Sequence, residues 1–151
     1  MRALVQRVKR CSIIIDGDVH SSIGPGMLIL LGVQRDDSEN DATSLAERCA
    51  NLRMFADSDG KMNLSARDVY RSAMVVSQFT LYGDTRKGNR PSYSEAASSQ
   101  HAEPLYDRFI EQLSVHLGAE RVAAGVFRAM MDVELVNDGP VTLLLESKNH
   151  Q

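Results

Sequence analysis

Apolar residues alternate with polar ones near the start of the chain and form a longer run soon after it. Arg2 to Lys9 and Cys11 to Ile15 have strand composition, and a turn at Asp16 to Asp18 precedes a further strand at Val19 to Ile23. Met27 to Val33 is a nearly continuous apolar run, which is typical of a strand covered on both faces. The pattern predicts an N-terminal hairpin followed by a buried central strand.

Two segments have the spacing of amphipathic helices. The first follows possible N-cap residues between Asp37 and Asp41 and ends near Arg53. The second runs from about Ala102 to Leu117, with Gly118 placed as a C-terminal stop. Apolar side chains recur at helical spacing in both, at Leu45, Cys49 and Leu52 and at Leu105, Phe109, Leu113 and Leu117.

The other β-rich segments complete a mixed sheet. Strands are expected in a small hairpin from Leu52 to Leu64 that turns at Asp57 to Gly60, in Ala73 to Phe79, and in three segments near the end of the chain, Arg121 to Phe127, Met131 to Val136 and Val141 to Glu146. The sequence therefore predicts one α+β domain over residues 1–151. Its mixed, mostly antiparallel and barrel-like sheets would pack with two main helices.

Composition limits what such a domain can do. The 151 residues are 43% hydrophobic and 25% charged, which is ordinary for a globular protein. The net charge of −3 argues against a broadly basic nucleic-acid binder, so any RNA contact must be local. Met1 to Lys9 lacks the apolar stretch of a signal peptide and no segment suits a membrane helix, so we expect a cytoplasmic protein.

Two short segments place polar groups beside apolar strands and are the candidates for a site. Ser77, Gln78 and Thr80 offer hydrogen-bonding side chains, and Phe79 offers a stacking surface. These residue types suit binding and oxyanion stabilisation better than proton abstraction. A strand end with hydroxyls facing water is the alternative. The second segment, Asn137 to Thr142, contains Gly139 and Pro140; it is either part of a site or a hairpin turn, and either isomer of its X-Pro bond is accessible.

Common catalytic arrangements are missing. There is no Gly-x-Ser-x-Gly elbow, and the sequence identifies no histidine partner for Ser77. No group of His, Cys, Asp and Glu has ligand spacing, so we expect neither a metal nor a cofactor. Four scattered histidines are interpreted as surface residues, His20, His101, His116 and His150, and two cysteines as buried free thiols, Cys11 and Cys49.

The chain resembles the bacterial D-aminoacyl-tRNA deacylases, which hydrolyse the ester between a D-amino acid and its tRNA. The resemblance extends almost from end to end. It rests on Arg2, Ala3 and Val5 to Val8; Gly24 to Gly26; Gly60 to Ser65; Ser77 to Leu81; Asp84 to Gly88; Arg90 to Ser92; and Asn137 to Thr142. Ser77 to Leu81 and Asn137 to Thr142 match the family's two signature motifs, and both are intact here.

This resemblance implies a homodimer in which Gly139 and Pro140, joined by a cis bond, reach into the active site of the other subunit. Their carbonyl oxygens would occupy the space that the side chain of an L-amino acid needs, so D-amino acids and achiral glycine would enter. Arg7 would help to hold the inserted segment, with Asn137 and Asp138 in supporting roles. A backbone selector of this kind distinguishes handedness without reading the side chain.

The same resemblance implies that the 2′-hydroxyl of the terminal ribose and protein backbone groups assist catalysis. Gln78 and Thr80 would position the substrate, although a nucleophilic Thr80 remains the alternative. Phe79 would line the pocket, and Met131 would pack near the terminal adenosine.

A basic loop supplies candidates for RNA contact. Arg86, Lys87 and Arg90 could meet phosphates near the acceptor end, or they could simply be solvated. Arg128 stands where the family often has glycine, and it adds a phosphate contact only if it lies near the tRNA entrance. A non-catalytic nucleic-acid-binding or scaffold dimer of the same fold is the second hypothesis.

Overall fold

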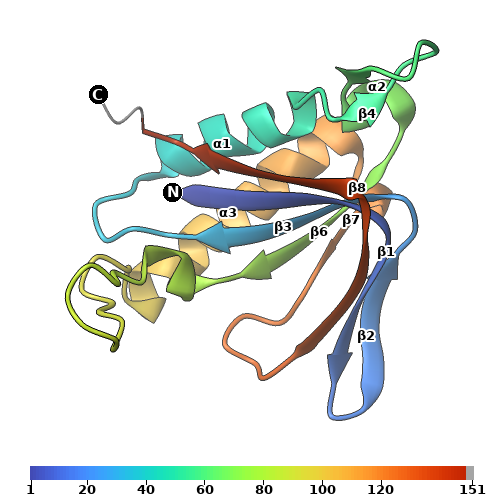
Figure 1. The fold of residues 1–151 in the computed structure, drawn as a ribbon. Coiled ribbons are helices and arrows are strands. Elements are labelled where there is room, and N and C mark those ends of the chain that lie inside the picture. The colour runs from blue at the N-terminus through green and yellow to red at the C-terminus, as the bar shows by residue number, and fades with distance from the viewer. Residues whose placement is uncertain (149–151) are drawn as a thin grey trace.

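A six-stranded sheet organises the chain in the computed structural model, which describes residues 1–148 (Figure 1). The strand order is β2-β1-β3-β6-β7, with β8 on the other edge of β1. The β3–β6 and β6–β7 pairs are parallel, and the other pairs of named strands in the described residues are antiparallel. The strands are β1 (Arg2–Ile15), β2 (Asp18–Ile23), β3 (Gly26–Gly32), β6 (Ser72–Ser77), β7 (Val122–Ala124) and β8 (Asp132–Glu146).

The long strand β1 makes the sheet curl on itself. Its first half pairs with β3 and its second half with β2, while β8 follows its other edge throughout. The β1–β2 and β1–β8 ladders carry register shifts, and strands bend at such irregularities. The far halves of β1, β2 and β8 therefore swing away from the central strands, as Figure 1 shows. This confirms the predicted α+β fold with a mixed, barrel-like sheet.

Successive side chains of the central strands point to opposite faces of the sheet, and each face packs into a separate hydrophobic core. In β3, Ile29 faces a core that contains the helices, whereas Leu28 faces a second core under the curled half of the sheet. In β6, Val75 and Met74 divide in the same way. Burial on both faces explains why these strands consist of continuous apolar residues.

The two predicted helices are present, and both cover one face of the sheet (Figure 1). They are α1 (Glu39–Asn51) and α3 (Ser99–Leu117), and Leu45 and Phe109 are completely buried between them and the strands. A capping box at Ser38 and Asp41 begins α1, and the Ser98 side chain caps α3. None of the helices within residues 1–148 is long and apolar enough to cross a membrane.

Several predicted boundaries were wrong. The strand expected to reach Phe79 ends at Ser77, and a 3₁₀ helix, η1 (Phe79–Tyr82), follows it. The strands expected on either side of Asn137 to Pro140 form one strand, β8, so this segment is not a hairpin turn. A one-turn helix, α2 (Ala66–Val69), was not expected, whereas the small hairpin of β4 (Phe55–Ala56) and β5 (Met62–Leu64) was.

Both cysteines are buried free thiols, as predicted. Burial raises the pKa of Cys11 to about 11 and that of Cys49 to about 12.

Candidate active site at the carboxyl end of the central strands

The first candidate segment lies where β6 leaves the sheet and turns into η1. The amide of Gln78 donates to the carbonyl of Leu31 on β3 at 2.8 Å, which fixes the start of the turn. Gly32 allows η1 to lie close against β3. A Cβ at that position would be 3.1 Å from the Cβ of Leu81 and 3.2 Å from the carbonyl oxygen of Gln78. Sheet and turn together hold this backbone in one place.

The side chains of this segment face outward from that fixed backbone. The Gln78 amide Nε2 donates a hydrogen bond to the Thr80 hydroxyl oxygen. Phe79 is 56% exposed, and its ring meets that of Tyr93 edge to face, with centroids 5.1 Å apart. The result is an open polar surface with an aromatic pair beside it.

A loop that links β7 to β8 borders the segment on one side. The Gly125 amide donates to the Val75 carbonyl at 3.0 Å, which continues the ladder along β6 toward Ser77. Met131 lies over Gly125, and its sulfur accepts a hydrogen bond from the Val126 amide at 3.4 Å. Met131 therefore packs at the border of the candidate site.

Arg128 is an exposed residue at the turn of this loop. Its φ of 67° lies in the left-handed region that glycine adopts without penalty. Arg128 adopts this conformation at a cost that glycine at the same position would not have.

The basic loop borders the segment on the other side. Arg86 makes two side-chain hydrogen bonds to Asp84, at 2.9 and 2.7 Å, and this pairing holds the pKa of the Asp84 carboxyl at about 2. Asp84 and Ser92 close the loop through two backbone hydrogen bonds of 2.7 and 2.9 Å. The remaining cations of the loop, Lys87 and Arg90, are exposed.

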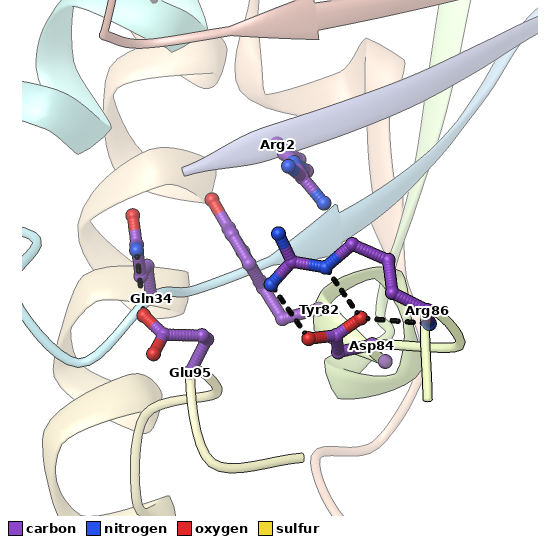
Figure 2. Close-up of a pocket in the computed structure, with 7 residues that line it drawn as sticks. Arg2, Gln34, Tyr82, Asp84, Arg86 and Glu95 are labelled. Carbon is purple, nitrogen blue, oxygen red and sulfur yellow. Dashed lines mark hydrogen bonds and ion pairs between the residues drawn. The ribbon is translucent and has the colours of Figure 1, made fainter. Parts of the chain in front are cut away.

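A hollow of about 340 Å³ lies beside η1, at the same end of the sheet (Figure 2). Its lining combines the start of β1, the segment after β3, the end of η1 and the basic loop. The residues are Arg2, Gln34, Tyr82, Gly83, Asp84, Arg86 and Glu95.

The second candidate segment lies within β8. The Gly139–Pro140 peptide bond is cis, Gly139 has a φ of 118°, and both residues are exposed. The Asn137 side chain braces the bend: its Oδ1 accepts from the Val141 amide at 3.3 Å and its Nδ2 donates to the Thr142 hydroxyl at 3.1 Å.

Arg7 ties this segment to the rest of the fold. Its Nε donates to the Asp138 carbonyl at 3.2 Å and lies 3.4 Å from the Asp138 carboxylate, while Nη1 donates to the Met54 carbonyl at 2.8 Å. The guanidinium also limits the space at Gly139, where a Cβ would lie 2.8 Å from Nη2. Arg7 is thus a partly buried residue whose guanidinium forms a bracket, a link between Asp138 on β8 and Met54.

The two segments lie apart on one chain. The β8–β1 register places Gly139 level with Arg7, and the ladders carry that level across β3 to Ala73 on β6. Ser77 lies further along β6, roughly 13 Å along the strand and about 14 Å across three strand spacings at ordinary sheet dimensions. The sheet therefore does not bring the two segments into one site within a subunit.

The described histidines take no part in this surface through any hydrogen bond found in the structure. The His101 ring bonds the Asp37 carbonyl at 2.8 Å, whereas His20 lies on β2 and His116 near the end of α3. His150 lies outside the described residues. Within residues 1–148 no three His, Cys, Asp or Glu side chains form a group that could hold a metal.

Sequence reasoning missed Tyr93 and Tyr82. The signal was available for the first, since an aromatic residue in a polar loop next to cations is typical of surfaces that bind single-stranded nucleic acid.

Fold and site together define a class: a barrel-like α+β protein with an open, neutral polar site flanked by two loops that carry cations. The chain belongs to the D-Tyr-tRNA(Tyr) deacylase family, whose model matches residues 4–146. A D-aminoacyl-tRNA deacylase of Fervidobacterium nodosum is 53% identical over 148 residues, covering 98% of both chains. One of Porphyromonas gingivalis is 52% identical over the whole of both chains.

Solved structures agree on the fold. A structure titled "c-Myc DNA Unwinding Element Binding Protein" matches with a TM-score of 0.94 at 39% identity, covering 99% of this chain and 100% of that one. A probable eukaryotic D-amino acid tRNA deacylase matches with a TM-score of 0.84 at 16% identity, covering 96% of this chain and 98% of the other. At that identity the second match speaks for the fold alone.

Proposed function

We propose that the protein hydrolyses the ester bond of D-aminoacyl-tRNA and releases a free D-amino acid and tRNA. The observation that carries the proposal is the family match over residues 4–146, which includes both motif segments unaltered. Water adds to the ester carbonyl, the bond to the ribose oxygen breaks, and that oxygen leaves with a proton. Such an enzyme works in the cytoplasm, where aminoacyl-tRNA is made and used.

Handedness is selected by Gly139 and Pro140 of a second subunit. The distance between the two segments on one chain supports this arrangement, because a partner copy can bring its own Gly139 and Pro140 to Ser77 to Thr80. Two large apolar side chains beside the bend in β8, Leu143 and Leu144, are 37% and 56% exposed and suit such a dimer contact. The two carbonyl oxygens then exclude the side chain of an L-amino acid, whereas D-amino acids and glycine fit.

Arg7 and Asp138 keep this selector in place. The bracket formed by the Arg7 guanidinium supports the role, since each of its two donors reaches a backbone carbonyl. A wall that excludes a side chain by steric contact has to be rigid, and a backbone held at several points is rigid.

Thr80 positions the substrate and does not attack it. Its hydroxyl accepts a hydrogen bond from the Gln78 amide. An amide N–H is a donor and cannot take the hydroxyl proton, so this contact does not activate a nucleophile. The ribose 2′-hydroxyl assists in its place. The backbone N–H groups of Phe79 and Thr80 lie in the first turn of η1, where N–H groups have no acceptor within the helix. They can therefore donate hydrogen bonds to the oxyanion that develops on the ester carbonyl.

The flanking cations contact the phosphates of the acceptor end. Four cations are exposed on the two loops, Arg86, Lys87 and Arg90 on the loop that follows η1 and Arg128 on the loop between β7 and β8. This local arrangement reconciles tRNA binding with a net charge of −3.

Hydrolysis of D-Tyr-tRNA and L-Tyr-tRNA under identical conditions tests the function. We expect release of D-tyrosine while the L-ester is spared, and equal rates on both would refute the selector. Mixing subunits tests its origin. A heterodimer of one Gly139→Trp subunit and one Thr80→Trp subunit should regain one intact site, whereas each homodimer should have none.

A non-catalytic nucleic-acid-binding protein is the second candidate, favoured by the 39% identical structure titled as a DNA-binding protein. That hypothesis predicts DNA binding without D-selective hydrolysis, so the same assay separates the two.

A further inference from the structure

The hollow beside η1 has no role in the reaction proposed above. Its volume of about 340 Å³ is near the lower limit for small-molecule sites, so it suits a single ring-sized group. Figure 2 shows Arg2 at one side of it, the pair of Arg86 and Asp84 at another, and the contact between Gln34 and Glu95 opposite.

The hollow and the candidate active site share the helix η1. Phe79 and Thr80 begin this helix, and Tyr82 at its end lines the hollow. A 3₁₀ helix rises about 2 Å per residue, so Thr80 and Tyr82 are only about 4 Å apart along its axis. Arg2, which also lines the hollow, donates to the Leu81 carbonyl of the same helix at 2.9 Å. A group in the hollow is therefore separated from a group at Thr80 by this one short helix.

The charges around the hollow favour a neutral polar ligand over a free anion. The Arg2 guanidinium pairs with Glu146 at 2.7 Å, and that of Arg86 pairs with Asp84 at the same distance. Arg2 also lies over the Tyr82 ring, 4.6 Å from its centre. Each guanidinium is already paired with a carboxylate, which lowers the attraction of this hollow for a free anion, and the guanidinium plane of Arg86 remains as a stacking surface.

Glu95 is the least constrained acceptor in this lining. Its carboxylate receives the Gln34 amide at 3.2 Å and lies 3.7 Å from Arg35, and its side chain is 44% exposed. A carboxylate accepts several hydrogen bonds, so Glu95 has capacity for another donor. A glutamate next to amide and guanidinium donors is the combination that recognises cytosine, whose amino group donates and whose ring accepts.

We propose that this hollow binds the cytosine base that precedes the terminal adenosine of the tRNA acceptor end, with Glu95 accepting from its amino group. The proposal rests on the proposed function. Unpaired RNA ends are commonly read in this way, by splayed bases that stack and present their hydrogen-bonding edges. Because tRNA acceptor ends share the sequence CCA, the contact adds affinity without preference among tRNAs.

Minihelices that carry D-tyrosine on either a CCA or a CUA end test the proposal, because uracil has an oxygen where cytosine has the amino group. We expect kcat/KM to fall about tenfold on the CUA substrate, the size of one good base contact. Glu95→Gln should reduce this preference to about twofold or less, since an amide both donates and accepts. Glu103→Gln, an exposed glutamate on α3, is the matched control and should retain the tenfold preference.

Uncharged minihelices give a second readout that needs no hydrolysis. The wild type should bind the CCA end about tenfold more tightly than the CUA end. Equal kcat/KM and equal binding of the two ends would overturn the cytosine site while D-selective hydrolysis stands. An undiminished preference in Glu95→Gln would overturn the role of Glu95. Absence of hydrolysis with a CCA preference in binding would instead refute the proposed function and support the base site.

Discussion

Substituting Gly139 by alanine should both destabilise the protein and weaken its discrimination between D- and L-esters. Gly139 has a φ of 118°, a conformation that costs a residue with a side chain about 1–2 kcal/mol. The new Cβ would also lie 2.8 Å from the Arg7 guanidinium and 3.0 Å from a Val141 methyl, and crowding of this kind costs about 1–3 kcal/mol. The two effects sum to about 2–5 kcal/mol.

Gly17→Ala is the matched control for backbone conformation. Gly17 has a φ of 82°, but nothing lies within 4 Å of the Cβ that alanine would add. The Gly17→Ala variant should therefore lose about 1–2 kcal/mol of the free energy of unfolding, which is the cost of the backbone conformation alone. It should keep full selectivity between the D- and L-esters. The difference between the two variants isolates the contact with Arg7 and Val141.

Urea unfolding followed by circular dichroism, at one protein concentration, measures the free energies. Rates on D-Tyr-tRNA and L-Tyr-tRNA measure the selectivity, which we expect to fall at least tenfold in Gly139→Ala, because the Arg7 guanidinium that holds Asp138 has to shift to relieve the contact. Equal destabilisation by the two substitutions, together with unchanged rejection of the L-ester, would refute this reasoning.

Three other changes test the site and the core. Thr80→Ala should retain substantial D-selective activity in steady-state assays, and its complete loss with tRNA binding intact would restore the nucleophile model. Arg128→Gly should raise the free energy of unfolding in urea by about 0.5–1 kcal/mol, because glycine adopts φ of 67° freely, whereas Arg128→Ala should give no gain. The free energy of unfolding should fall as the pH rises above about 9, because the unfolded chain releases the thiol protons of Cys11 and Cys49 before the folded chain does. Unfolding curves measured over a series of pH values check this, and replacing both cysteines by alanine should make the free energy of unfolding less dependent on pH.

The periodic elements could be predicted because their patterns have a single explanation. A continuous apolar run such as Met27 to Val33 needs cover on both faces, and the structure provides it with two cores. The stripe from Leu105 to Leu117 could only be the buried side of a helix. Small shifts at the ends of these elements came from capping, as at Ser98, which extends α3 by several residues toward its start.

The site was harder to predict because it depends on contacts between distant segments. The residues around Ser77 carry no local sequence signal that β6 ends there. The turn is fixed by the hydrogen bond to the Leu31 carbonyl and by the absence of a side chain at Gly32. The bend at Gly139 resembles a hairpin turn in composition, but pairing with β1 on both sides of it keeps the strand continuous. Residue types indicated the two candidate segments, and strand register determined where they lie.

Because Gly139 and Pro140 interrupt a paired strand instead of forming the tip of a loop, their position follows the sheet. Pairing of Asn137 with Val8 and of Thr142 with Gln6 clamps both ends of the bend. Loops drift as sequences diverge and as temperature rises, but a ladder that is tied to the core does so far less. The stereochemical filter that we propose for this segment takes its fidelity from the mechanical stiffness of the whole domain, so error rates should rise only as the sheet itself begins to open.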